Sequence, residues 1–83
     1  MYYVYVRWSK KLEEHYVGYS TNLRSRLASH NRGSVAATRN GQPWKLVYYE
    51  AYLSDELARI REHSLKRNRG RGLQLLYKRI TSA

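Results

Sequence analysis

Tyrosine, arginine and histidine side chains occur close together in the stretch HYVGYSTNLRSRLASHN, residues 15–31. Phosphodiester hydrolysis uses side chains of these types. A base takes a proton from the attacking water, a cation meets the charge on the phosphoryl oxygens, and the leaving oxygen is stabilised. The stretch supplies Tyr16, Arg26 and His30, and other parts of the chain add Tyr5 and Glu62. These side chains predict a site that hydrolyses phosphodiester bonds.

Other chemistries have no motif in this sequence. Its histidines lack the H-x3-H and H-E-x-x-H spacings of zinc sites, and there is no cysteine to supply a thiolate. No serine lies in a G-x-S-x-G elbow, and no glycine-rich nucleotide-binding motif is present. Glu62 alone is sufficient for one Mg²⁺ or Mn²⁺ ion, because Mg²⁺ keeps most of its waters and takes other ligands from a substrate phosphate.

The charge of the chain indicates a polyanionic partner. Its 83 residues carry 16 Lys and Arg against 6 Asp and Glu, and 11 of the cations are arginine, whose planar fork suits phosphate. The cations run along the whole chain instead of gathering on one amphipathic helix, which favours nucleic acid, in the first place DNA, over a membrane. No apolar run approaches the roughly 18 residues of a membrane span. We expect a cytoplasmic protein that is a monomer or weak homodimer.

The strands that would position the tyrosines are marked by β-branched and aromatic residues. In the first strand, period-two alternation puts Tyr3, Tyr5 and Arg7 on one face. A short polar connection would then bring Tyr16 onto the neighbouring antiparallel strand, beside Tyr5. The strands are expected at residues 2–8, 15–19 and 45–53.

Helical patterns follow the second and third strands. The intervening residues 32–44 have no sustained period and read as a loop with at most one helical turn. Helices are expected at 21–31, capped by Ser20 or Thr21; from Ser54 to about residue 67; and at 73–80, after a hinge at 68–72. This order predicts one α+β domain, residues 1–83, with a small three-stranded, mainly antiparallel sheet flanked by three or more helices.

Arg26 and His30 fall on the inner side of the first predicted helix. At 100° per residue they share about one third of the circumference with Leu23 and Leu27. Arg26 should therefore point towards the sheet or a cleft beside it. His30 either joins Arg26 there or caps the C-terminal end of the helix, where a partly charged imidazole is favourable.

Two of the other candidate residues also have a purely structural interpretation. Tyr16 would be an ordinary ring packed in a strand. Glu62 borders an apolar stripe but stands four positions before Lys66, and such an ion pair contributes only a few tenths of a kcal/mol.

Several segments, taken in order and spacing, resemble a GIY-YIG nuclease domain. They are the tripeptides Y3-V4-Y5 and Y16-V17-G18, the helical run NLRSRLASHN at 22–31, and REHSLK at 61–66. The run PWKLVYYEA and the later Gly- and Arg-rich stretch are similar to the small stand-alone members described as excinuclease-like. The resemblance covers nearly the whole chain.

The resemblance implies a metal-dependent endonuclease with roles for individual residues. Tyr16 would be the general base, helped by Tyr5 or His30; Arg26 would steady the transition state; and Glu62 would hold one divalent cation. A tyrosine with a pKa near 10 is a weak base at neutral pH, so surrounding cations or the metal ion would have to lower that pKa, and Arg26 and the metal ion would act in that direction. For the asparagine that many members place near the end of the domain, the nearest candidates are Asn68 and Gln74.

Other basic and aromatic residues are expected to contact nucleic acid without taking part in catalysis. Two further functions stay open: a catalytically weak or inactive basic module that binds DNA or RNA, and a basic protein associated with RNA or a membrane surface. Strong sequence preference is not expected of so small a surface unless the chain dimerises. The expected contacts are Tyr19, Arg24, Arg39, Lys45, Lys66, Arg67, Arg69 and Arg71.

Overall fold

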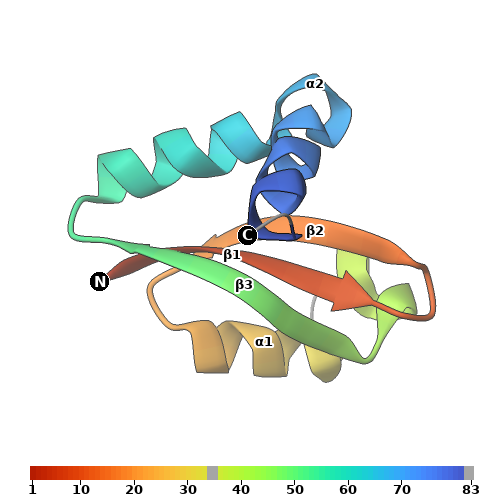
Figure 1. The fold of residues 1–83 in the computed structure, drawn as a ribbon. Coiled ribbons are helices and arrows are strands. Elements are labelled where there is room, and N and C mark those ends of the chain that lie inside the picture. The colour runs from red at the N-terminus through yellow and green to blue at the C-terminus, as the bar shows by residue number, and fades with distance from the viewer. Residues whose placement is uncertain (34–35, 82–83) are drawn as a thin grey trace.

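The computed structural model describes residues 1–33 and 36–81, apart from the side chains of residues 36–38, 68–70, 77, 80 and 81. Within the described ranges, no helix combines the length and the apolar character that crossing a membrane requires. The elements are β1 (Tyr2–Ser9), β2 (Glu14–Ser20), α1 (Leu23–Asn31), the 3₁₀ helix η1 (Ala36–Gly41), β3 (Trp44–Tyr52) and α2 (Asp55–Thr81) (Figure 1).

The strands form a three-stranded sheet in the order β2-β1-β3, and both pairings are antiparallel. Tyr5, in the central strand, lies opposite Gly18 of β2 and Tyr49 of β3. The β1–β3 register shifts between Val6 and Arg7. The predicted α+β class and the antiparallel three-stranded sheet are confirmed.

Helices cover both faces of the sheet, with α1 on one side and α2 on the other (Figure 1). The alternation of β1 divides its side chains between these layers. Val4 and Val6 are buried on the α2 side, whereas Tyr5 contacts His30 of α1. The buried hydrophobic cluster between the sheet and α2 consists of Val4, Val6, Val17, Ala58, Leu65 and Leu76.

Both α-helices begin after a polar side chain that caps the first turn, but the cap of α1 is not one of the two residues predicted. The side chain of Asn22, and not Ser20 or Thr21, accepts a hydrogen bond from the Ser25 amide at 3.1 Å and caps α1. Ser20 instead accepts from the Asn22 amide with its hydroxyl, which fixes the turn before the helix. Ser54 caps α2 as predicted, accepting from the Leu57 amide at 3.2 Å.

The expectation of a separate final helix is wrong in its detail. Helical geometry continues through residues 68–72 as part of α2, although the helix axis turns sharply there (Figure 1). A Cβ at Gly72 would lie 2.3 Å from the carbonyl oxygen of Ser64. In a straight helix, residues eight positions apart are separated by about 12 Å. The second arm therefore folds back on the first, and the absence of a side chain at Gly72 permits that contact.

The segment between α1 and β3 contains η1, in agreement with the helical turn allowed for it. Asn31, at the end of α1, fixes the start of β3. Its side chain accepts from the Trp44 amide at 2.5 Å and donates to the Trp44 carbonyl at 3.0 Å. These contacts bring the Trp44 ring to the α1 side of the sheet, 5.3 Å from the ring of Tyr16 between centroids.

Candidate active site

Tyr5 lies at the centre of the candidate site because its partner across the sheet has no side chain. A Cβ at Gly18 would lie 2.4 Å from Cζ of the Tyr5 ring, so the ring occupies the space above this glycine. Tyr5 is 2% exposed, and its hydroxyl lies 3.1 Å from Nε2 of His30. The glycine of the second tripeptide thus positions the tyrosine of the first.

His30 is a buried, uncharged histidine. Burial first, and then the charges of Arg7 and Arg26, lower the pKa of His30 to about 4. Nη1 of Arg7 donates to the Tyr5 hydroxyl oxygen at 3.4 Å, which directs the hydroxyl proton towards Nε2 of His30. The low pKa of His30 disfavours the alternative in which a partly charged imidazole caps α1. At the end of this helix, the backbone amides of Arg32 and Gly33 donate to the carbonyls of Ala28 and His30.

Three of the four predicted catalytic residues, Tyr5, Arg26 and His30, meet the predicted metal ligand Glu62 beside the edge strand β2. Arg26 and His30 come from α1, and Glu62 comes from α2 on the opposite face, so the two helix layers converge beside Gly18. They line a pocket of about 330 Å³, which we call the catalytic pocket. Its lining residues are Tyr5, Arg7, Val17, Gly18, Tyr19, Arg26, His30, Arg59, Glu62 and Lys66.

Tyr16 is not among these lining residues. Its side chain is 40% exposed, and its hydroxyl donates to Oε2 of Glu14 at 2.8 Å. This hydrogen bond is the largest cause of a raised pKa for Tyr16; burial and the charge of Glu14 add to it, and the charge of Arg7 opposes it. The structure thus differs from the expectation that Arg26 helps to lower this pKa: the cation that acts on Tyr16 is Arg7.

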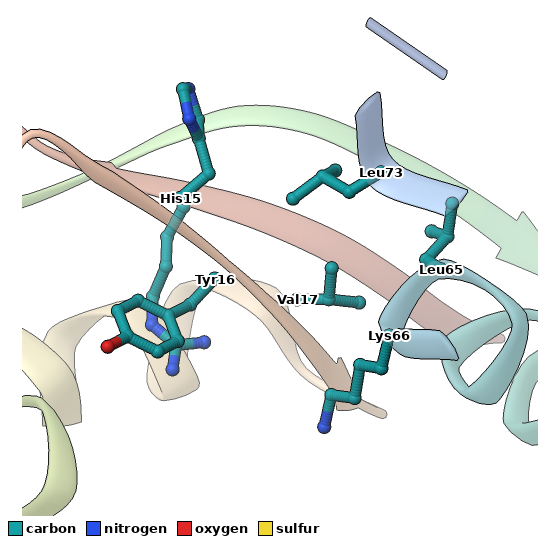
Figure 2. A pocket seen from close by; sticks show the side chains of 7 residues that line it. His15, Tyr16, Val17, Leu65, Lys66 and Leu73 are labelled. Atoms are coloured by element: carbon teal, nitrogen blue, oxygen red, sulfur yellow. The ribbon is translucent and has the colours of Figure 1, made fainter. Parts of the chain in front are cut away.

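A second pocket of about 390 Å³, which we call the outer pocket, is drawn in Figure 2. It shares Arg7, Val17 and Lys66 with the catalytic pocket. It lies between β2 and both arms of α2. In Figure 2, Val17 lies at its centre, with Tyr16 and Lys66 on one side and Leu65 and Leu73 on the other. Its lining residues are Arg7, His15, Tyr16, Val17, Leu65, Lys66 and Leu73.

Arg7 is a site residue that the sequence prediction missed. It is 7% exposed, and its Cζ lies 5.7, 5.5 and 5.2 Å from the ring centroids of Tyr5, Tyr16 and Trp44. No Asp or Glu of the described residues forms an ion pair with Arg7, and its Nε has no hydrogen-bond partner. The alternation of the first strand placed Arg7 on the same face as Tyr5. This shared face could have identified Arg7 as a site residue.

Arg59 is a second residue of the catalytic pocket that was not predicted. Its guanidinium lies 4.3 Å from the centroid of the Tyr19 ring and pairs with Asp55 at 3.1 Å. The Tyr19 hydroxyl donates to the same carboxylate. Asp55 therefore joins Arg59 and Tyr19, which both line the catalytic pocket.

Glu62 lies where it could bind a metal ion and also forms the ion pair with Lys66 that the sequence allowed. It lines the catalytic pocket, and its Oε2 lies 3.2 Å from Nζ of Lys66. Within the described part of the chain, no cluster of three Asp, Glu, His or Cys side chains could hold a metal ion. The carboxylate of Glu62 and the hydroxyl of Tyr5 are hard oxygen donors, which fit a Mg²⁺ ion that takes its other ligands from water and a substrate phosphate.

The residues expected to contact nucleic acid divide into two groups. Tyr19 and Lys66 line the catalytic pocket. Arg39 does not, and its Nε donates to the Gly33 carbonyl at 3.0 Å. The side chains of Asn68 and Arg69 lie outside the described residues, and exposed Gln74 lines neither pocket. The remaining basic residues, Arg24, Lys45, Arg67 and Arg71, are exposed and also line neither pocket.

Comparison with known proteins gives a consistent family match. The model of the GIY-YIG catalytic domain matches residues 1–75. UPF0213 proteins of Streptococcus pyogenes serotypes M5, M3 and M1 are each 43% identical over 63 residues, which is 75% of this chain and 68% of the relative. No solved structure matches this chain significantly.

Proposed function

Because this chain belongs to the GIY-YIG catalytic-domain family, we propose that it is a metal-dependent endonuclease that hydrolyses phosphodiester bonds of nucleic acid, DNA in particular. We further propose that residues 1–83 act as one domain. The observation that carries the proposal is the convergence of Tyr5, Arg26, His30 and Glu62 on one pocket.

The positive charge of the catalytic pocket suits a phosphodiester group. Arg26, Arg59 and Lys66 line it together with the lone carboxylate of Glu62. In the proposed mechanism the phosphate enters this pocket, and Arg26 neutralises the charge that develops on its non-bridging oxygens. When bound, the divalent cation would be held by Glu62 and would act as a Lewis acid on the phosphoryl oxygens.

A tyrosine takes the proton of the attacking water in this mechanism. Tyr16 is the proposed general base, and it would act from the outer pocket across the boundary at Arg7 and Val17, which line both pockets. Its hydroxyl proton has an acceptor in the carboxylate of Glu14 at 2.8 Å. As Tyr16 receives the water proton, its own proton can pass to Glu14. A tyrosine with a raised pKa can act as a base by such a transfer, because no free tyrosinate has to accumulate.

Tyr5 and His30 support the same step from inside the pocket. The neutral imidazole of His30 holds the Tyr5 hydroxyl in place, and that hydroxyl can orient a water or a phosphate oxygen. Both side chains are buried, so their geometry is fixed before substrate enters.

The second candidate function is a binding module of the same fold without efficient catalysis. Two contacts favour it, because they engage the side chains that catalysis would need. Tyr16 is hydrogen bonded to Glu14, and Glu62 is paired with Lys66. Such a module would hold nucleic acid through its cations alone, so binding would fall steeply with salt.

A cleavage screen separates the two functions. Plasmid, single-stranded, duplex, flap and junction DNA, and a structured RNA, would be incubated with Mg²⁺ or Mn²⁺. The endonuclease predicts cleavage by the wild type and loss of cleavage in Tyr16→Phe and Arg26→Ala. Arg32→Ala is the matched control, because this exposed arginine at the C-cap of α1 lines neither pocket. Binding without cleavage on any substrate would favour the module, and equal cleavage by wild type and both site variants would reveal a contaminant.

A further inference from the structure

The outer pocket contains the proposed general base, Tyr16, but the proposed hydrolysis assigns no ligand to the rest of this cavity. Its volume of about 390 Å³ lies within the usual range of small-ligand sites. The side chains of Val17, Leu65 and Leu73 give it an apolar wall, and Tyr16 contributes an aromatic ring (Figure 2). A ligand with flat apolar faces and an attached anion would match this lining.

The outer pocket is continuous with the catalytic pocket. Arg7, Val17 and Lys66 line both of them. The junction therefore carries two cations beside an apolar valine. In a nucleic-acid strand, a phosphate follows each nucleoside, and a chain that leaves the catalytic pocket at this junction would bring its next charged group close to Arg7 and Lys66.

Arg7 at this junction has no counter-charge of its own. The described residues offer it no acidic partner, its Nε makes no hydrogen bond, and burial lowers its pKa. A buried cation without an anionic partner is costly, and a bound anion reduces that cost. Lys66 already pairs with Glu62, but its side chain is 54% exposed and remains open to a phosphate from solvent.

We propose that the outer pocket binds one unpaired nucleobase next to the scissile phosphate, so that the substrate is a single strand or an unpaired flap. The phosphate between the two pockets would lie against Arg7 and Lys66, and the base would contact Val17, Leu73 and the Tyr16 ring. A base inside a duplex is paired and stacked, and it cannot enter without leaving the helix. The inference rests on the proposed function, because that function places the scissile phosphate in the catalytic pocket.

Binding without cleavage tests the pocket directly. Fluorescence anisotropy in EDTA would compare an oligothymidylate, an abasic strand with the same number of phosphates, and a duplex. Stacking of one base predicts that wild type binds the oligothymidylate about tenfold more tightly than the abasic strand. This ratio should fall to near one in Leu73→Gln and stay near tenfold in Leu75→Gln. Leu75 is the matched control, since it lies on the same arm of α2, is exposed, and does not line the outer pocket.

Some results would overturn the proposal. These are a ratio near one in wild type, an unchanged ratio in Leu73→Gln, or binding of the duplex as tight as that of the single strand. Leu73 is partly buried against the core, so circular dichroism would first confirm that the variant folds.

Photocrosslinking of the wild type needs no variant. A strand containing 5-iodouracil should form adducts with Tyr16 or His15, the aromatic residues that line the outer pocket. Adducts confined to Tyr3 of β1 and Tyr49 of β3, whose rings contact each other and line neither pocket, would overturn the inference. Neither measurement requires cleavage. A single-strand preference without cleavage would therefore refute only the proposed nuclease, whereas cleavage of duplex and single strand at equal rates would refute only the base pocket.

Discussion

The ring of Tyr5 occupies the space that a side chain would take at Gly18, 2.4 Å from Cζ of the ring to the position of the missing Cβ. This contact joins the two tripeptides of the family motif across one pair of antiparallel strands. It also holds the Tyr5 hydroxyl beside His30. Position 18 therefore needs a glycine because any side chain there would clash with the Tyr5 ring, and not because the backbone adopts a conformation that favours glycine.

Gly18→Ala tests this relationship. The added methyl group must displace the buried Tyr5 ring, and such overpacking costs about 1–3 kcal/mol of unfolding free energy. We expect a folded but less stable protein in which the Tyr5–His30 hydrogen bond is lost and cleavage is strongly reduced. Urea denaturation and an activity assay would measure the two effects.

Gly72→Ala is the matched control for this prediction. Its Cβ would meet the Ser64 backbone, which cannot move aside as a side chain can, so the stability loss should be at least as large. Gly72 does not line the catalytic pocket. Below its unfolding temperature, the Gly72→Ala protein should cleave at nearly the wild-type rate, and a loss of cleavage equal to that of Gly18→Ala would contradict the assigned role of Gly18.

His30 should make the stability of the fold depend on pH. Its pKa is about 4 in the folded protein, below its ordinary value of 6.5, so the unfolded chain binds the additional proton. The stabilisation is complete above pH 6.5 and is lost as the pH falls towards 4, by at most about 3 kcal/mol. Urea denaturation between these pH values would show it. His30→Gln keeps an acceptor for Tyr5 but does not titrate, so its stability should change less over this window; an identical pH dependence would contradict the prediction.

Arg7 and Glu14 should shift the pKa of Tyr16 in opposite directions. Arg7→Met removes a cation whose charge lowers this pKa, so the Tyr16 pKa should rise. Glu14→Gln removes the charged acceptor that raises it, so the pKa should fall. NMR titration of ¹³Cζ-labelled tyrosine, assigned with Tyr16→Phe, would measure both shifts. Shifts of the same sign in the two variants, or no shift in either, would refute this description of the site.

Much of the fold followed from residue patterns that local physics determines. The β-branched and aromatic residues of β1 predicted the strand, and its period of two placed Tyr5 and Arg7 on one face. The angular position of His30 on its helix pointed this side chain towards the sheet. Both follow from backbone periodicity. The capping residue was missed by one position because Ser20, Thr21 and Asn22 are all good caps, and only the geometry of the turn selects among them.

The remaining features depend on contacts between distant segments. A buried arginine contradicts the usual exposure of charged residues, so alternation alone did not identify Arg7 as part of the site. The Gly- and Arg-rich stretch predicted a break before the final helix, but Gly72 packs on Ser64 and helical geometry persists. For Tyr16, the raised pKa comes from Glu14, two positions earlier on the same face of β2. Alternation could have revealed that pair.

The most direct test of the nuclease proposal is the cleavage rate of Glu62→Gln with Mg²⁺, measured beside wild type and Glu56→Gln. Glu56 is an exposed acid in the first turn of the same helix and does not line the catalytic pocket, so its variant controls for a lost charge on α2. The ion pair of Glu62 with Lys66 is exposed enough that its loss should cost less than about 1 kcal/mol of stability. We predict that Glu62→Gln cleaves about 100-fold more slowly than wild type while Glu56→Gln is unchanged. Equal rates in all three proteins would contradict the role of Glu62 as the metal-binding carboxylate of an active nuclease.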